Sequence, residues 1–531
     1  MAAVRAYALI GTEAVAVQVE AHVRPGLPGV SMVGLPGVAV REARERVRSG
    51  AASTGMPLPT QRITVNLSPA DVRKEGPGFD LPVALAVLAA SGYVSTGALQ
   101  GVGAMGELAL DGLLRPIRGM LSVAEAARDD GIILLIVPLV GLAEVCAVDG
   151  VRAVGVRDLR EAVMVLRDAG KRERLLERGR RWLRTRKIEA FVDRGPDLAD
   201  IAGQRHAKRA LEVAAAGGHH LMMVGPPGAG KTMLARRLPS VLPLLDATEA
   251  LEVTRVWSVA GLHRPEDGLA TRRPFRAPHH SASRSAVIGG GSPPRPGEAS
   301  LAHRGVLFLD EFPEFSRDVI ESLRQPLEEG LVVISRKGGS LTLPAAFTLV
   351  GAMNPCPCGN LMHPERACRC TADMLDRYRG RLSGAVGDRI DLFIDVPPLE
   401  LSAFDPVDGR DDDSAVVRAR VESARSFRLE RESLLSALPC SSEEGGGTGR
   451  SHPERLESRM GVSDGARSLL REALSRHVVG GRGYVRALTV ARTLADLDAM
   501  SAISPDHVAE ALSLRDPGCE CRSLVAAGLR C

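Results

Sequence analysis

The chain has 531 residues, a length that exceeds a single hydrophobic core and predicts about three domains. Hydrophobic residues make up 45% and charged residues 25% of the sequence, which is typical of a globular protein and excludes a chain without packed cores. The formal net charge is only +4, so a surface that binds nucleic acid would have to be local.

The N-terminal residues and the apolar runs argue against export or a membrane span. The first residues lack the apolar core of a signal peptide. The most apolar run, Ile132–Val140, contains Pro138 and is too short to cross a bilayer. Four of the nine cysteines fall within fifteen residues, which suits a metal site in a reducing cytoplasm. We therefore expect a cytoplasmic protein without a membrane partner.

Residues 1–166 alternate short β-like runs with helices, which predicts an α+β domain. Pro82 suits the first turn of a helix, and Asp111-Gly112 suits the turn of a hairpin. The predicted elements are strand Ile63–Leu67, helix Leu81–Ser91, hairpin Gly106–Gly112, helix Gly119–Asp129 and strand Ile132–Pro138.

Two stretches of this domain, Ser68–Asp80 and Gly106–Leu121, resemble the proteolytic domain of Lon-type proteases. Those enzymes use a serine nucleophile that a neighbouring lysine activates. The matching positions here hold Gly78 and Leu121, and neither side chain can act as nucleophile or base. The resemblance therefore implies a Lon-protease-like fold without peptidase activity, serving as a scaffold or as a surface for a protein partner.

Residues 167–190 are strongly basic and are predicted to link the first domain to the next one. One interpretation is electrostatic contact with nucleic acid. A solvated helix face with Arg–Glu spacing explains the same residues. The sequence leaves both open.

A short strand, a glycine-rich loop and a helix follow in the order that defines a phosphate-binding loop. Strand Leu221–Val224 is apolar, and a helix begins around Met233. Glycines let backbone N–H groups surround phosphate oxygens at a helix N-terminus. The lysine of such a loop reaches the β- and γ-phosphates, and the hydroxyl that follows it binds Mg²⁺. The loop comprises Gly225, Pro226, Pro227, Gly228, Ala229, Gly230, Lys231 and Thr232. The sequence therefore predicts that the chain binds ATP with Mg²⁺.

Two later apolar strands end in polar side chains that fit the same chemistry. The run that begins at Gly305 ends in Asp310 and Glu311. Asp310 is predicted to hold Mg²⁺, and Glu311 to polarise the attacking water. The run from Phe347 ends in Asn354, whose amide can contact the γ-phosphate or orient that water. This order of motifs resembles ATPases of the AAA+ class.

Three further stretches narrow the resemblance to the magnesium-chelatase-like subfamily, and the first domain narrows it to the YifB/ComM branch. These stretches are Arg273–Ser281, Ile288–His303 and Leu323–Gly330. The resemblance implies an α/β multidomain fold with an N-terminal Lon-protease-like (S5 domain 2-like) domain, a parallel-sheet AAA+ core and a C-terminal helical lid. The implied layout is the Lon-like domain over 1–166, the linker over 167–190, the ATPase core over 191–400, a linker with one helix over 401–458, the lid over 459–516 and a tail over 517–531.

The same resemblance assigns roles to several basic residues. Arg389 resembles the arginine finger that a neighbouring subunit inserts beside the γ-phosphate. Arg482 or Arg486 resembles the lid arginine that senses nucleotide, with Arg482 favoured. Each of these could instead be a surface salt-bridge partner. Arg336 and Lys337 lie at the tip of a predicted hairpin, where they would contact DNA phosphates or be merely solvated.

Four cysteines directly follow the second of the polar-ended strands, and they form two close pairs about ten residues apart. Such pairs can wrap one Zn²⁺ tetrahedrally, although the C-x-C spacing is tighter than usual. With four thiolate ligands the site would be structural, since no open position is left. The predicted ligands are Cys356, Cys358, Cys368 and Cys370.

These observations favour a ring-forming homo-oligomer, with hexamer as the expected size, that hydrolyses ATP. The resemblance extends this to a DNA helicase or branch-migration factor of the ComM type, acting in recombination or natural transformation. The alternative is a magnesium-chelatase-like motor that remodels a partner protein for metal insertion. A protease is disfavoured because both residues of the dyad are missing.

Overall fold

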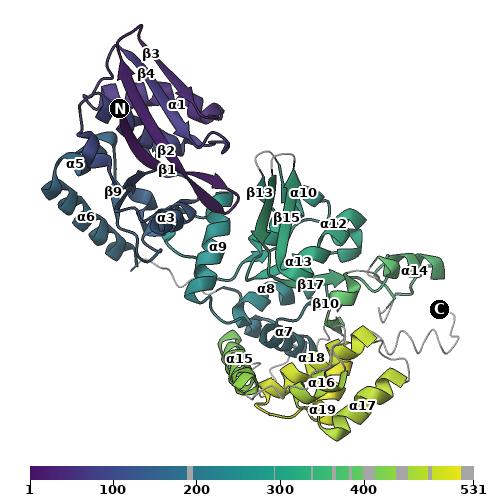
Figure 1. Ribbon diagram of the computed structural model, residues 1–531. Helices are drawn as coiled ribbons and strands as arrows, with labels where there is room; N and C mark the ends of the chain where they lie inside the picture. The colour runs from purple at the N-terminus through teal and green to yellow at the C-terminus, as the bar shows by residue number, and fades with distance from the viewer. Residues whose placement is uncertain are drawn as a thin grey trace, which may run out of the picture.

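The computed structural model shows three units that follow one another along the chain: an N-terminal unit built on a sheet, a central unit with a parallel sheet, and a C-terminal set of helices (Figure 1). The described helices include none that is long and apolar enough to cross a membrane. The structure describes residues 1–187, 195–291, 294–336, 339–361, 366–381, 386–398, 413–437, 453–475 and 481–515.

A seven-stranded sheet in the order β3-β4-β2-β1-β5-β8-β9 forms the N-terminal unit. Its longest strands, β1 (Ala2–Ile10) and β2 (Glu13–Arg24), pair antiparallel and are absent from the elements predicted from the sequence. β1 is rich in alanine, which has little intrinsic strand preference, so burial and pairing with the valine-rich β2 decide its structure. The sheet stacks on α2 (Asp80–Ala90), whose first ten residues are all buried.

The remaining elements of this unit confirm the predicted strands and helices to within a few residues. They are β3 (Gly29–Val33), α1 (Val38–Ser53), β4 (Arg62–Ser68), β5 (Val102–Ala104), β6 (Glu107–Leu108), β7 (Leu114–Arg115), α3 (Met120–Asp129), β8 (Leu134–Pro138), α4 (Leu142–Val145), β9 (Ala153–Val156) and α5 (Leu159–Arg167).

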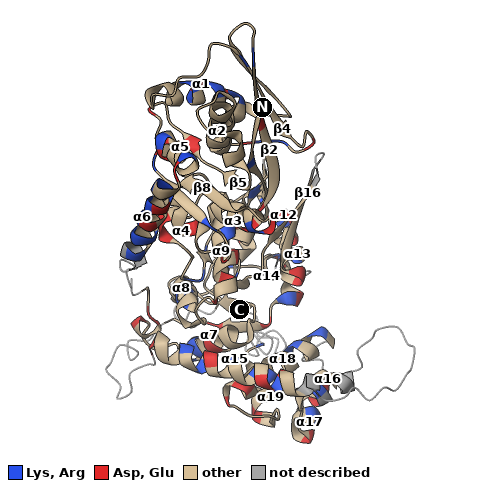
Figure 2. Ribbon diagram, turned by 60° about the vertical axis from the view of Figure 1, so that its left-hand side comes forward, with Lys and Arg blue, Asp and Glu red and all other residues tan. Residues whose placement is uncertain are grey.

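The basic segment predicted as a linker is a helix over most of its length, α6 (Ala169–Lys187). Figure 2 shows Lys and Arg along it, while Leu176 and its neighbours pack against the N-terminal core. Arg178 binds Glu161 of α5 through two hydrogen bonds of 2.5 and 2.7 Å. This part of the segment is therefore packed on the first unit rather than spanning freely between units.

One helix of the central unit, α9 (Ala247–Ala260), joins it to the N-terminal unit. Ser258 on α9 accepts a hydrogen bond from the backbone N–H of Gly119 at 2.8 Å and donates one to Glu144. Glu144 also accepts from the backbone N–H of Leu121 at 2.9 Å, and burial raises the pKa of its carboxyl group. Buried polar groups that are paired in this way fix the orientation of the two surfaces they join.

The central unit contains a five-stranded sheet in the order β11-β14-β17-β10-β18, and all its neighbouring strands run parallel. Because β10 lies between β17 and β18, the chain changes direction across the sheet there, which is where parallel α/β sheets place ligands. The strands are β10 (Leu221–Val224), β11 (Phe275–Arg276), β14 (Val306–Leu309), β17 (Thr348–Met353) and β18 (Leu392–Asp395).

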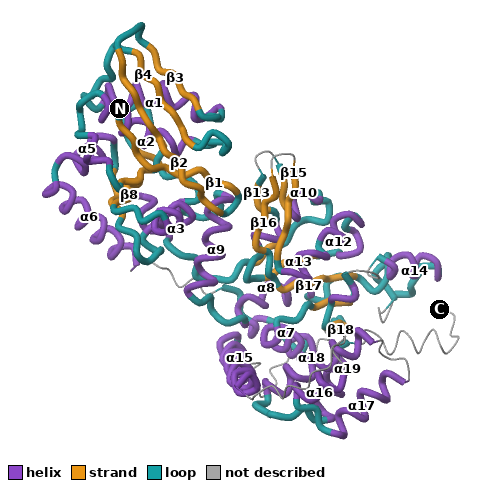
Figure 3. Tube along the Cα trace, viewed as in Figure 1, coloured by secondary structure: helices purple, strands orange, loops and turns teal. Residues whose placement is uncertain are grey.

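Helices cover this sheet, and a two-stranded hairpin of β15 and β16 stands out from it toward the N-terminal unit (Figure 3). A Cβ atom at Gly11, in the β1–β2 turn, would lie 2.0 Å from Leu341 of the hairpin, so the two units touch there. The further elements are α7 (Arg205–Gly217), α8 (Lys231–Val241), α10 (Arg284–Ile288), β12 (Gly289–Gly290), β13 (Arg295–Pro296), α11 (Glu298–Leu301), α12 (Arg317–Ser322), α13 (Arg324–Glu329), β15 (Leu331–Arg336), β16 (Gly339–Pro344) and α14 (Ala372–Gly380).

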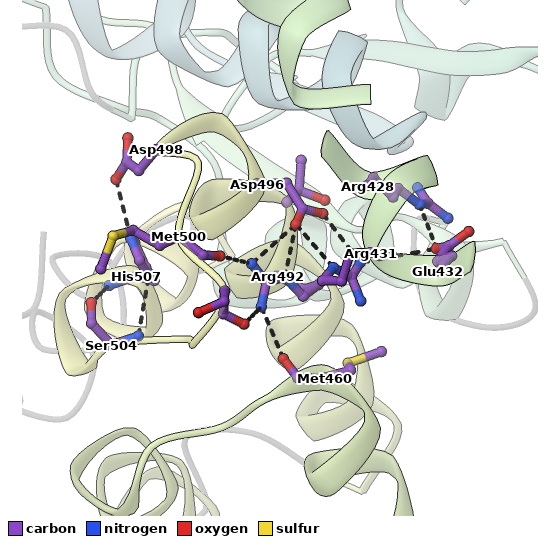
Figure 4. Close-up of polar contacts among 12 residues, drawn as sticks. Arg428, Arg431, Glu432, Met460, Arg492, Asp496, Asp498, Met500, Ser504 and His507 are labelled. Carbon is purple, nitrogen blue, oxygen red and sulfur yellow. Dashed lines mark hydrogen bonds and ion pairs between the residues drawn. The ribbon is translucent and has the colours of Figure 1, made fainter. Parts of the chain in front are cut away.

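The C-terminal unit consists of helices held together by a buried arginine (Figure 4). Arg492 donates to Asp496 at 3.0 Å and to the backbone carbonyls of Met460 and Ser501 at 2.9 and 2.8 Å. Arg431 pairs with the same aspartate at 3.4 Å. The helices are α15 (Ser414–Ala437), α16 (Pro453–Met460), α17 (Asp464–Ser475), α18 (Gly481–Leu497) and α19 (Pro505–Ser513). The predicted tail over 517–531 and the stretches 401–412 and 438–452 of the predicted linker lie outside the described residues.

His220 joins the three central strands, and this predicts a pH dependence of stability. Its Nδ1 accepts from the backbone N–H of Leu349 at 3.1 Å, and burial lowers its pKa to about 4. The unfolded imidazole takes up a proton near pH 6.5, so the free energy of unfolding falls as the pH drops from about 6.5 toward 4.

One such proton changes the free energy of unfolding by up to ~1.4 kcal/mol per pH unit. We therefore expect the free energy of unfolding of His220→Asn to fall less steeply with decreasing pH, by up to this amount. The measurement is the thermal midpoint of wild type and variant at about pH 7.5 and 5.5. His206→Asn is the matched control, because His206 is exposed on the same unit. Equal pH dependence in wild type and His220→Asn would contradict the assignment.

Candidate nucleotide site

The glycine-rich loop leaves the carboxyl end of β10 and enters α8, as the sequence predicts. Gly225 allows a close approach, because a Cβ atom there would lie 2.2 Å from the carbonyl oxygen of Val396. Gly228 and Gly230 have φ angles of +81° and +90°, which favour glycine. The loop thus takes a conformation that turns backbone N–H groups inward at a helix N-terminus, the arrangement that suits phosphate.

Lys231 begins α8 and lies at the centre of the loop. Its Nζ donates to the carbonyl oxygens of Gly225 and Pro226 at 2.6 and 2.9 Å, and to Oδ1 of Asn354 at 3.3 Å. Burial lowers the pKa of Lys231, and the carboxylate of Asp310 partly opposes this. Its amine is therefore held among oxygen acceptors at the point where the sequence places the β- and γ-phosphates.

Thr232 and Asp310 meet beside this lysine. The hydroxyl of Thr232 donates to Oδ2 of Asp310 at 2.8 Å, although the two residues are 78 positions apart in the sequence. A hydroxyl and a carboxylate are oxygen ligands of the kind that Mg²⁺ prefers. The pair therefore fits the magnesium ion that accompanies a nucleoside triphosphate.

Glu311 follows Asp310 and turns its carboxylate away from the strand. Its φ angle is +50°, and its backbone N–H donates to Oδ1 of Asp310 at 3.0 Å. Oε2 of Glu311 lies 3.0 Å from Nδ1 of His280. Sequence patterns gave no signal for this contact, because the two residues lie on separate loops that only the fold brings together.

Arg389 lies at the opposite edge of the central sheet from the phosphate loop. It directly precedes β18, which runs parallel to β10 with Leu221 opposite Leu392, whereas the loop follows the far end of β10. The four residues of β10, Leu221–Val224, that pair with β18 span about 10 Å, and this is the distance between the two edges of the sheet. The side chain of Arg389 forms an ion pair with Glu328 of α13 and is 13% exposed.

The two lid arginines lie close to Arg389. Arg482 pairs with Asp388, and Arg486 pairs with Asp391 and donates to the carbonyl oxygen of Arg389 at 2.8 Å. Burial, followed by the charges of the nearby arginines, lowers the pKa of Arg389. The structure thus gathers the predicted finger and both sensor candidates at one edge, and the phosphate loop at the other.

The remaining predicted site residues divide into two groups. Arg336 ends β15, while Lys337 lies outside the described residues, so the predicted DNA-binding tip stays a prediction. The sulfur atoms of the four clustered cysteines lie within 4.8 Å of one another. In the N-terminal unit, Gly78 and Leu121 are both buried. A Cβ atom at Gly78 would lie 2.8 Å from Cδ1 of Ile117 and 2.9 Å from Cε of Met105, so apolar side chains fill the space beside this glycine.

Comparison with known families agrees with this geometry. The family described as "Magnesium chelatase, subunit ChlI" matches residues 197–404, and its C-terminal counterpart matches residues 411–515. The family described as "Subunit ChlI of Mg-chelatase" matches residues 19–140. The parallel α/β core is consistent with the AAA+-type ATPases of this group.

Whole-chain relatives decide the family. Competence protein ComM of Haemophilus influenzae is 40% identical over 97% of both chains, and protein YifB of Escherichia coli is 40% identical over 96% of both. An uncharacterized protein of Mycobacterium tuberculosis is 42% identical over 96% of this chain and 98% of its own. The chain belongs to the YifB/ComM family of magnesium-chelatase-like proteins. The YifB/ComM relatives match along all three units, so the family likeness includes the N-terminal unit as well as the phosphate loop.

Lys231→Ala tests the nucleotide site. At a concentration of about 100 Kd, an ATP analogue should stabilise the wild-type protein by about 2.7 kcal/mol, and the variant should lose this gain. Thermal unfolding with and without analogue measures it. Arg236→Ala is the matched control, since Arg236 is exposed on the same helix. Equal stabilisation of wild type and Lys231→Ala would show that the nucleotide binds elsewhere.

Proposed function

We propose that this protein is a ring-forming ATPase whose shared active sites drive movement on DNA. The observation that carries the ATPase part is the meeting of three strand ends. Lys231 contacts Asn354, and Thr232 contacts Asp310, so the loop after β10 lies against the ends of β17 and β14. These are the side chains that phosphoryl transfer to water requires at one place.

Each side chain has a defined task in this proposal. The loop backbone and Lys231 bind the triphosphate, while Thr232 and Asp310 would hold Mg²⁺. The ion would supply charge neutralisation for the phosphate oxygens. Glu311 orients and deprotonates the attacking water, and Asn354 fixes the γ-phosphate. His280 holds the carboxylate of Glu311 and would release it when water and nucleotide are in place.

The position of the arginines supports sharing of the site between subunits. Arg389, Arg482 and Arg486 lie about 10 Å of strand away from the phosphate-binding edge of their own chain. Stacking chains head to tail would present this arginine edge to the phosphate loop of the next chain, and such a contact forms a ring when the rotation between chains closes. We therefore assign both the finger and the lid sensors to the neighbouring subunit's nucleotide.

The DNA part of the proposal rests on family membership and on charge. The relative from Haemophilus influenzae is named a competence protein, and the basic face of α6 and the predicted tip at Arg336 and Lys337 could neutralise phosphates. Forked or three-stranded DNA is the proposed substrate, as expected for branch migration. A protein-remodelling motor like magnesium chelatase is the second candidate, favoured only by the names of the matching families.

Mixing two inactive variants tests the shared site. Glu311→Gln should trap ATP, and Arg389→Ala should lose about 10³-fold or more in turnover. In a one-to-one mixture, about a quarter of the interfaces would pair an intact phosphate-loop side with an intact finger, so about a quarter of wild-type turnover should return. Arg317→Ala, which removes an exposed arginine, should not need rescue. If mixed rings form and ATP turnover does not recover, the proposal of an active site shared between subunits is overturned.

The DNA assignment predicts a substrate preference and a salt dependence. ATP turnover should rise with forked or three-stranded DNA more than with a plain duplex, and DNA affinity should fall by about 10³-fold or more between 50 and 200 mM salt. A panel of DNA structures in one ATPase assay measures both. Turnover that ignores every DNA but responds to a protein partner would favour the chelatase-like motor instead.

A further inference from the structure

The four-cysteine cluster lies against the nucleotide site, although no step proposed above uses it. Cys356 and Cys358 follow β17 within five residues of its end, and Cys368 and Cys370 precede α14. The sulfur of Cys356 lies 3.3 Å from that of Cys358 and 3.6 Å from that of Cys368. The sulfurs of Cys358 and Cys368 are 3.6 Å apart, and all four lie within 4.8 Å of one another.

These separations distinguish one metal ion from a pair of disulfides. Sulfur ligands of a tetrahedral ion with Zn–S bonds of about 2.3 Å lie about 3.8 Å apart. A disulfide would need about 2.05 Å between two sulfurs, with the other pair free to move away. The observed set is mutually close in every direction, which is the shape of a closed tetrahedral site for a single ion.

Backbone groups around the cluster point toward the sulfurs. The N–H of Leu361 bonds to Cys356, and the N–H groups of Asn360 and Arg369 bond to Cys358. Each of Cys368 and Cys370 likewise accepts a backbone N–H from within the cluster. Such N–H···S bonds are the outer shell that orients thiolate ligands and offsets their charge.

We infer that Cys356, Cys358, Cys368 and Cys370 bind one structural Zn²⁺ that holds the phosphate loop and Asn354 in fixed positions. Binding releases protons from the four thiols as the Zn–S bonds form, without any oxidation or reduction. With four sulfur ligands the site is closed, so the ion takes no part in ATP chemistry.

Two contacts connect the cluster to the nucleotide site. A Cβ atom at Gly359 would lie 2.9 Å from Cδ of Pro227, so the turn between the cysteine pairs packs directly on the phosphate loop. The backbone N–H of Asn354 bonds to the hydroxyl of Tyr378 on α14, the helix that follows the second pair. The ion would therefore tie β17, the phosphate loop and α14 into one rigid group.

Metal content of the full-length protein tests the site directly, whether or not the chain hydrolyses ATP. Protein purified without chelator should contain about one zinc per chain by elemental analysis. Cys358→Ser combined with Cys370→Ser should lose it, while Cys146→Ser, which changes an exposed cysteine of the N-terminal unit, should keep it. Zinc-free wild type, zinc retained in the double variant, or iron in its place would overturn the inference.

A second measurement uses wild-type protein only, so it tests the inference even if the double variant does not fold. Wild-type protein denatured with chelator and without reductant should present all nine thiols to a thiol reagent. Peptide mapping of the labelled sites assigns any shortfall, and a disulfide that includes Cys356, Cys358, Cys368 or Cys370 would overturn the inference.

The zinc site makes a kinetic prediction that mere structural damage would not reproduce. Protein stripped of zinc and then freed of chelator should still bind an ATP analogue at about one site per chain, which excludes a damaged fraction, while its kcat falls several-fold, since Asn354 contributes to the reaction more than to binding. Zinc added back should restore kcat. If ATP turnover is absent throughout while zinc is bound as expected, the proposed function fails and the zinc site stands.

Discussion

The parallel pairing of β10 with β17 on one side and β18 on the other is the constraint on which the rest depends. It sets Leu221 opposite both Val350 and Leu392, so the ends of three strands coincide at one edge. The strands β10 and β17 approach each other closely at Gly351. A Cβ atom at Gly351 would lie 2.4 Å from Cε of Met222, so only glycine allows the two strands and Met222 to pack in this way. A shift of one residue would separate Lys231 from Asn354.

The same sheet has two chemically different edges. At the carboxyl edge, oxygen acceptors surround Lys231 and a hydroxyl meets a carboxylate. At the amino edge, Arg486 donates to the carbonyl oxygen of Arg389 and forms an ion pair with Asp391. In the proposed mechanism, the arginines at the amino edge complete the phosphate site of a neighbouring chain. On that proposal, oligomerisation follows from the layout of the site.

The surroundings of the site hold this arrangement in place. The N-terminal unit, without the residues of a peptidase, is fastened to α9 through Ser258 and Glu144. On the other side, the C-terminal helices are joined by Arg492 and Asp496. The cysteine cluster supports the loop from a third direction. The first two of these attachments use buried polar groups joined by hydrogen bonds, which give orientation as well as stability.

The sequence by itself determined most local elements and predicted the chemistry of the candidate site. The phosphate loop, the strands before Asp310 and Asn354, and the helix after Lys231 are where they were expected, because these motifs are local and their glycines and apolar runs dictate conformation. Tertiary structure decided the pairing of the alanine-rich β1 with β2, the packing of α6, the contact of His280 with Glu311, and the edge that carries Arg389. These depend on partners far away in the sequence, and no local pattern of residue types encodes a register between distant strands.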